Sequence, residues 1–192
     1  MIPASEAPWA DIRAVFGSHG TSSTCQCQRY KLRPRESFGS FPAEDRADRL
    51  RRQTGCGDPA TRSTSGLLAY SGDEPVGWCA VEPRSAYVGM VRTGRVPWAD
   101  RNEDRNDSTV WAITCLLIRV GFRRRGVSRE LVRESVGFAR ARGARALEAY
   151  PMAVPTGLPE ENHVGLRIVF ADAGFTQVAQ PTLRRVVMRI DF

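Results

Sequence analysis

Lysine is almost missing from this chain of 192 residues: Lys31 is the only one, so arginine carries nearly all of the net charge of +7. No apolar run approaches the ~18 residues of a membrane-spanning helix, and the longest, Val110–Ile118, is interrupted by Thr114. The first residues have neither the basic start nor the apolar core of a secretory signal. These absences predict a cytoplasmic protein with no membrane association.

The five cysteines, Cys25, Cys27, Cys56, Cys79 and Cys115, are an odd number, which argues against a disulfide framework. Cys25 and Cys27 would share one face of a strand, because side chains alternate along strands. A metal site normally needs four ligands, and the chain has no second pair at matching spacing. We therefore expect no metal site and interpret the cysteines as small core residues.

An arginine-rich chain calls for an anionic partner. The planar guanidinium group binds two phosphate oxygens at once, so a phosphorylated cofactor is a natural candidate. Nucleic acid is disfavoured, because the arginines are not interleaved with aromatic residues and no nucleic-acid-binding motif is present.

Hydrophobic periodicity indicates a single α/β domain. It predicts strands at 24–32, 66–70, 76–81, 146–150, 176–179 and 183–190, in addition to Val110–Ile118. It predicts helices at 8–16, 42–53, 127–142 and 163–173. Gly55, Gly57 and Pro59 mark a loop, and residues 83–108 are expected to be irregular. The unit 110–150 should be a right-handed parallel strand–helix–strand crossover in a mixed sheet.

The junction between the strongest strand and the strongest helix carries the chemistry. A helix N-terminus has unbonded N–H groups and a positive dipole end, which together bind anions. Gly126 lets the backbone approach a phosphate closely. Arginines surround this glycine, namely Arg123, Arg124, Arg125 and Arg129, and like charges packed so closely repel one another unless an anion lies among them. The junction therefore suits a pyrophosphate.

Residues 123–128 read Arg-Arg-Arg-Gly-Val-Ser, and this segment resembles the cofactor motif of the GNAT N-acetyltransferase superfamily. That motif is Arg or Gln, two residues, Gly, one residue, then Gly or Ala, so Ser128 departs from it. The segments 143–151 and 170–175 add to a resemblance that covers roughly residues 66–190. It implies a mostly antiparallel sheet flanked by helices, with residues 1–60 as N-terminal elements of the same domain and 61–192 as an acyl-CoA-binding core.

The resemblance also implies an activity: an acetyl group would pass from acetyl-CoA, or another short acyl-CoA, to a primary amine that attacks the thioester directly. The main chain of Leu116, Leu117 and Ile118 would bind the pantetheine arm. Backbone N–H groups of residues 124–128, which include Val127 and Ser128, would bind the pyrophosphate. The surrounding arginines would bind phosphates, including the 3′-phosphate. The acceptor would be a small molecule or a peptide, and a homodimer stays open.

Many members of this superfamily place a tyrosine acid where this chain has Phe170. Glu148, Tyr150 and His163 are the remaining candidates for acid or base. Glu148 fits either a base acting through water or a salt bridge to a neighbouring strand. Tyr150 fits either the acid or a packed strand end, and His163 fits either a base or a bystander. Cys115 has no supporting His or Asp nearby in sequence, so we expect it in the core.

The acceptor itself is not specified. Asp100, Glu103, Asp104 and Asp107 could attract a cationic amine, but they alternate with arginines and could instead neutralise them. Trp98 and Trp111 could line an acceptor pocket or pack in the core. The missing tyrosine also leaves a second function open, a non-catalytic domain that binds CoA as a sensor or binds a partner.

Overall fold

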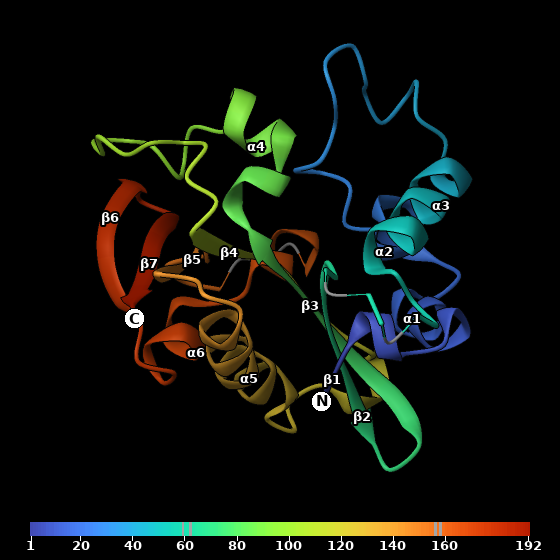
Figure 1. Ribbon diagram of the computed structural model, residues 1–192. Helices are drawn as coiled ribbons and strands as arrows, with labels where there is room; N and C mark the ends of the chain where they lie inside the picture. The colour runs from blue at the N-terminus through green and yellow to red at the C-terminus, as the bar shows by residue number, and fades with distance from the viewer. Residues whose placement is uncertain (59, 62, 156, 158) are drawn as a thin grey trace.

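The computed structural model describes residues 1–58, 60–61, 63–155, 157 and 159–192, so Pro59 lies outside it. In this part of the chain, seven strands form one sheet in the order β1-β2-β3-β4-β5-β7-β6 (Figure 1). Neighbouring strands are antiparallel except β4 and β5, which are parallel. The strands are β1 (Ile2–Pro3), β2 (Gly66–Ser71), β3 (Glu74–Pro83), β4 (Val110–Ile118), β5 (Ala146–Ala149), β6 (Thr176–Thr182) and β7 (Arg185–Asp191). The predicted mixed, mostly antiparallel sheet is confirmed.

Helices cover both faces of the sheet (Figure 1). One face packs against α5 (Val127–Ala141) and α6 (Arg167–Ala171), and the other packs against α1 (Trp9–Phe16), α3 (Ala43–Thr54) and α4 (Val88–Thr93). The short helix α2 (Gly20–Cys25) lies beside α3. Within the described residues, no helix combines the length and the apolar character needed to cross a membrane.

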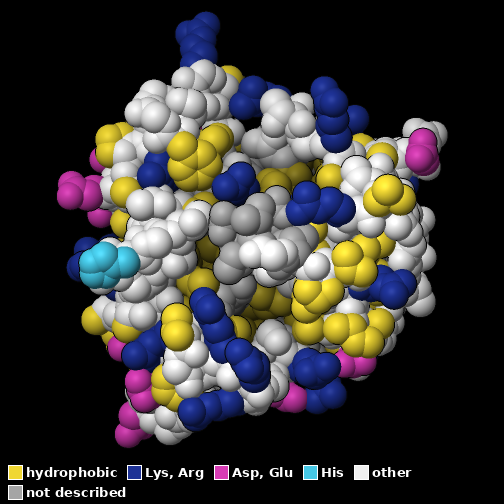
Figure 2. Space-filling view, turned by 180° about the vertical axis from the view of Figure 1, so that it is seen from behind, with side chains coloured by type: hydrophobic (Ala, Val, Ile, Leu, Met, Phe, Trp, Pro, Cys, Tyr) yellow, Lys and Arg dark blue, Asp and Glu magenta, His cyan; other side chains and the backbone are white. Residues whose placement is uncertain are grey.

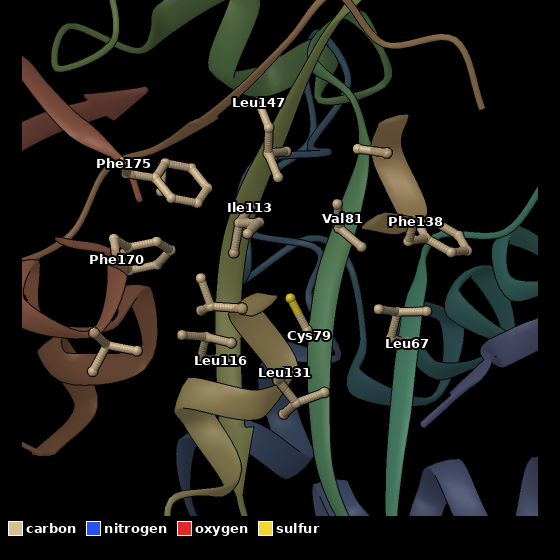
Figure 3. Close-up of a cluster of buried hydrophobic side chains, with 14 of the residues drawn as sticks. Leu67, Cys79, Val81, Ile113, Leu116, Leu131, Phe138, Leu147, Phe170 and Phe175 are labelled. Atoms are coloured by element: carbon tan, nitrogen blue, oxygen red, sulfur yellow. The ribbon is translucent and has the colours of Figure 1, made fainter. Parts of the chain in front are cut away.

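The larger core lies between the sheet and α5, and Figure 3 shows its side chains meeting there. Leu131 and Phe138 come from the buried side of α5, as the helical spacing predicts. Leu67 and Cys79 point toward the same layer from β2 and β3. The next residues along these strands, Leu68 and Ala80, face α1 on the opposite side, because side chains alternate across a sheet.

The predicted strand at 24–32 is wrong. Residues 20–25 form α2, and Gln26 and Cys27 then adopt left-handed backbone conformations, with φ of 49° and 52°. The alternation along residues 24–32 does not reflect a strand with one apolar face, because the residues buried at alternate positions are the polar Gln26 and Gln28. The segment crosses the sheet face to reach α4, where the carbonyl of Tyr30 accepts a hydrogen bond from the N–H of Met90.

The predicted helix at 163–173 is shorter than expected. It begins at Arg167, because Gly165 has a φ of 80° and separates it from a preceding 3-10 turn, Pro159–Val164. The region 83–108 is also not wholly irregular, because it contains α4, and the short strand β1 was not anticipated. The helices predicted at 8–16, 42–53 and 127–142 are confirmed, as is the hairpin of β2 and β3.

Candidate active site

The parallel strands β4 and β5 separate halfway along β4. They pair only from Val110↔Ala146 to Ile113↔Ala149, and β4 then continues alone to Ile118. At the same level the register between β3 and β4 shifts, so that Thr114 is an extra residue that bends β4. Beyond this bulge, the β5 side of β4 pairs with no other described strand, and its main-chain groups are available to a ligand.

The turn that follows β4 ends in a helix N-terminus shaped for an anion. Gly126 caps α5 with a φ of 83°, and its carbonyl accepts the first hydrogen bonds of the helix, from Arg129 (2.9 Å) and Glu130 (3.2 Å). Within the described chain, the N–H groups of residues 124–128 donate no hydrogen bond. A Cβ atom on Gly126 would meet no atom within 4 Å, so the space beside this backbone is open.

The arginines of the turn differ in their partners. The Nε of Arg123 donates to the carbonyl oxygen of Ile118 at 3.3 Å, and the Nε of Arg129 lies 2.8 Å from the Oδ2 of Asp172. Arg124 has no ion pair with any described residue, although it lies in the middle of this cationic turn. Arg125 turns away, and its guanidinium carbon lies 5.2 Å from the centre of the Phe122 ring. The turn therefore presents some arginines to a ligand but not all of them.

A cavity of about 1090 Å³ runs along this edge of β4 and the start of α5. Its wall contains every predicted cofactor-binding residue except Arg125. The cavity also continues past β4 to the end of α1, α2 and residues 25–29. The face shown in Figure 2 is hollowed near its centre, with hydrophobic side chains at the bottom and Lys and Arg side chains around the hollow. One space therefore joins the anion-binding turn, the open strand edge and the N-terminal helices.

Of the catalytic candidates, only His163 lines the cavity. Glu148 lies on β5 and is fully buried. Arginines surround its carboxylate: Arg189 Nη1 lies at 2.8 Å, Arg84 Nη1 lies at 3.1 Å, and Arg101 also contacts it. Arg189 stands opposite Glu148 on the neighbouring strand β7. The geometry therefore favours the salt-bridge interpretation of Glu148.

The electrostatics of Glu148 and its arginine partners also favour the salt-bridge interpretation. Burial acts to raise the pKa of Glu148, but the hydrogen bond and charge of Arg101, together with Arg84, outweigh it and lower the pKa. The hydroxyl of Tyr150 donates to Glu148 Oε2 at 2.9 Å, and burial together with this carboxylate raises the pKa of Tyr150 well above its usual value. A strongly paired carboxylate is a weak base and such a tyrosine is a weak acid, so both groups suit structure better than proton transfer.

The comparisons with known proteins identify the family. The model of the acetyltransferase (GNAT) family matches residues 28–154, which are about two thirds of the chain. The protein belongs to the GNAT acetyltransferase family. A search of the curated proteins found no match.

The fold is also similar to that of a solved N-acetyltransferase structure. A ribosomal-protein-alanine N-acetyltransferase from Brucella melitensis is 17% identical, with a TM-score of 0.52 over 97% of this chain and 98% of that chain. An acetyltransferase from Thermus thermophilus is 18% identical, with a TM-score of 0.49 over 97% and 95%. At such low sequence identity, structural similarity indicates a shared fold and does not identify the acceptor of this protein.

Phe170, the position at which we expect the tyrosine acid of many GNAT enzymes, is fully buried against Phe175, and the two ring centres lie 5.5 Å apart. It packs beside Gly165, where a Cβ atom would come within 2.7 Å of the Phe170 ring. The position therefore works as part of the core in this protein. His163 lies in the turn just before Gly165. Among the titratable side chains on the cavity wall, it is the nearest to Phe170 in the sequence.

Sequence reasoning did not anticipate the second side of the cavity. Cys27 and Cys115 both line it, and Trp78 Nε1 donates to Cys27 Sγ at 3.1 Å. A hydrogen bond with Cys115 and burial raise the pKa of Cys27 well above its usual value, so this thiol stays protonated. In the described residues, no group of three His, Cys, Asp or Glu side chains is arranged to hold a metal ion. In the sequence, the only feature that points to this side of the cavity is the Cys25–Cys27 pair, whose alternation predicts a strand.

The loop that carries Asp100, Glu103, Asp104 and Asp107 does not reach the cavity. Glu103 pairs with Arg84, Arg101 and Arg189, and Asp107 pairs with Arg145 at 2.8 Å, so these carboxylates neutralise arginines of the protein itself. The two tryptophans are also elsewhere: Trp111 packs against Phe138, and Trp98 lies under the guanidinium of Arg84. Of the alternatives that the sequence leaves open, the geometry favours carboxylates that neutralise the protein's own arginines and tryptophans that pack in the core.

Proposed function

We propose that this GNAT protein transfers an acetyl group from acetyl-CoA to a primary amine by direct attack of the amine on the thioester. The observation that carries the proposal is the single cavity, which joins the unbonded N–H groups at the start of α5 to the open edge of β4. A pyrophosphate and a pantetheine arm need these two features side by side. Family membership supports an acyl-CoA-dependent acyltransferase.

The chain would hold the cofactor mostly with main-chain groups. The N–H groups of residues 124–128 would bind the pyrophosphate, and the edge of Leu116, Leu117 and Ile118 would bind the pantetheine arm as an added strand does. Arg124 and Arg123 would supply side-chain contacts to phosphates from the cavity wall.

In the reaction, the amine nitrogen forms a bond to the acetyl carbon while the carbon–sulfur bond of the thioester breaks. A main-chain N–H on the β4 edge would stabilise the negative charge that develops on the carbonyl oxygen. We assign His163 as the base that takes the proton of the attacking amine and returns it to the CoA thiolate, since it lines the cavity and has a suitable intrinsic pKa. Glu148 and Tyr150 would instead hold β5 against β7.

The test is steady-state kinetics with acetyl-CoA and a broad panel of amines, with each product identified by mass spectrometry. Direct attack predicts an acetylated amine and intersecting initial-rate lines. His163→Gln should lower kcat roughly 100-fold, the usual contribution of a general base, and leave the Kd of acetyl-CoA unchanged. Parallel lines together with an acetylated cysteine peptide would contradict direct attack.

Phe170 favours one alternative, a domain that binds CoA without turnover, because the usual proton donor is absent at this position. That function predicts cofactor binding with no acetylated product from any amine in the panel. A single product formed at a rate that depends on His163 would exclude it.

A further inference from the structure

The cavity has a second end whose chemistry differs from that of the cofactor turn. We name it the acceptor end and define it by His19, Ser22, Cys25, Cys27 and Arg29, which line the cavity on the α1–α2 side. It adjoins β4, because Cys27 and Cys115 pack against the same core cluster and both line the cavity. A ligand bound there would lie on the α1–α2 side of the cavity, apart from the β4–α5 turn.

The described wall of the cavity contains no Asp or Glu side chain. Apart from the thiols of Cys25, Cys27 and Cys115, its titratable side chains are all basic: His19, Arg29, Arg119, Arg123, Arg124, Arg129 and His163. Figure 2 agrees, since Asp and Glu side chains lie toward the outline of this face rather than around the hollow. A cavity lined by one sign of charge concentrates ligands of the opposite sign.

Arg29 distinguishes the acceptor end from the cofactor turn. The other wall arginines lie in or beside the β4–α5 turn, where the phosphates of a cofactor would neutralise them. Arg29 is exposed, and its guanidinium carbon lies 5.8 Å from the centre of the Phe38 ring. No described carboxylate pairs with it. This guanidinium therefore offers its hydrogen-bond donors to a ligand in the acceptor end.

We propose that the acceptor is an amine that also carries a carboxylate or phosphate group, and that Arg29 binds this anionic group. The proposal rests on the acetyltransferase function above and names its substrate class. A basic wall repels a polycation such as a polyamine, whereas an acceptor with its own anionic group is attracted and oriented. The same positive field lowers the pKa of the acceptor amine, which increases the fraction of neutral nucleophile.

The test compares acceptors that differ only in the anionic group. Each α-amino acid is paired with its amide, phosphoethanolamine is paired with ethanolamine, and putrescine and spermidine represent polycations. Acetyl transfer is followed as CoA release, and the product is identified by mass spectrometry. The carboxylate and phosphate arms separate the two sources of negative charge. The proposal predicts that the anionic member of a productive pair has a kcat/KM at least about 10-fold higher, the usual value of a charged hydrogen bond.

Variants locate the effect. Arg29→Gln should raise the KM for the anionic acceptor roughly 10- to 100-fold and leave both kcat and the Kd of acetyl-CoA nearly unchanged, whereas Arg29→Lys should restore part of the affinity. Arg13→Gln is the matched control, because Arg13 is equally exposed on α1 but does not line the cavity.

The outcomes separate this proposal from the function on which it rests. A preference for the amides, ethanolamine or the polyamines would overturn the anionic acceptor and leave the acetyltransferase function intact. An anionic preference that survives Arg29→Gln would overturn the role of Arg29. Acetyl-CoA binding with no product from any acceptor would overturn the catalytic function and, with it, the substrate class.

Discussion

Two groups of arginines in this protein have opposite surroundings. Around Glu148, which we call the Glu148 cluster, the guanidinium groups of Arg84, Arg101 and Arg189 are buried and meet carboxylates. At the β4–α5 turn, the arginines are largely exposed, and Arg124 meets no described carboxylate. The two groups lie on either side of the point where β4 and β5 separate.

The difference shows what each group stabilises. A buried charge without a partner is costly, so the Glu148 cluster holds together only when it is complete. It fixes β5 against β7 and against the loop before β4. Exposed like charges repel one another, so the turn arginines cost little only when an anion is bound. The first group therefore stabilises the fold itself, whereas the cofactor that we propose would stabilise the second.

The largest expected effect breaks the Glu148 cluster. Glu148→Gln leaves buried arginines without their shared carboxylate and should lower the free energy of unfolding by about 3–5 kcal/mol, measured by urea denaturation, while the Kd of acetyl-CoA stays unchanged. Glu130→Gln is the control, because Glu130 forms an exposed pair with Arg133 on α5 and should change stability by less than about 0.5 kcal/mol. Unchanged stability together with a large fall in kcat would instead make Glu148 the base.

The next effect acts on the turn. Gly126→Asp places a negative charge in the open space beside the phosphate site and should weaken acetyl-CoA binding roughly 100-fold, measured by calorimetry. Gly143→Asp is the matched control, since its φ of 79° is close to the 83° of Gly126 and the same strain arises outside the cavity. Equal losses in the two variants would show that backbone strain, not the phosphate site, causes the change.

A smaller effect separates neighbouring arginines. Arg124→Gln should weaken acetyl-CoA binding about 10-fold, because Arg124 lines the cavity and has no carboxylate partner. Arg125→Gln should change the Kd much less, because Arg125 lies over Phe122 and not on the cavity wall. If both variants lost affinity equally, the turn would bind anions through its total charge rather than through one side chain.

The smallest effect is a dependence on pH. The pKa of Glu148 is lowered in the folded protein, so its stabilisation is present above the unfolded pKa near 4.3 and is lost as the pH falls through the folded pKa. The stability difference between the wild type and Glu148→Gln should therefore shrink in urea titrations as the pH falls below about 4.3. A difference that stays constant with pH would show that the carboxylate charge is not what stabilises the cluster.

The same contrast explains how far the sequence predicts this structure. The strand β4, helix α5 and the turn between them follow from local periodicity and the glycine at 126, so the elements that form this side of the cavity are predictable from the sequence. The salt-bridge alternative for Glu148 was foreseen, but its partners Arg84 and Arg101 come from a region expected to be irregular. Contacts between distant segments leave no period in the sequence.

At the acceptor end, in contrast, the local sequence pattern does not predict the path of the chain. The alternation around Cys25 and Cys27 indicated a strand, but left-handed conformations at Gln26 and Cys27 turn the segment across the sheet. Cys27 thereby reaches Cys115, and Arg29 reaches the cavity wall. Contacts with distant segments hold this path, such as the hydrogen bonds that join Gln28 to Gln53 on α3 and Trp78 on β3 to Cys27, so the acceptor end could not be predicted from local pattern.

The most direct test of the central claim is calorimetric titration of the wild-type protein with acetyl-CoA, CoA and 3′-dephospho-CoA. The account predicts micromolar binding of acetyl-CoA and CoA, and weaker binding of 3′-dephospho-CoA, because arginines of the β4–α5 turn contact the 3′-phosphate. No binding of any of the three would contradict it, since the open edge of β4 and the N–H groups of residues 124–128 would then have no cofactor to hold.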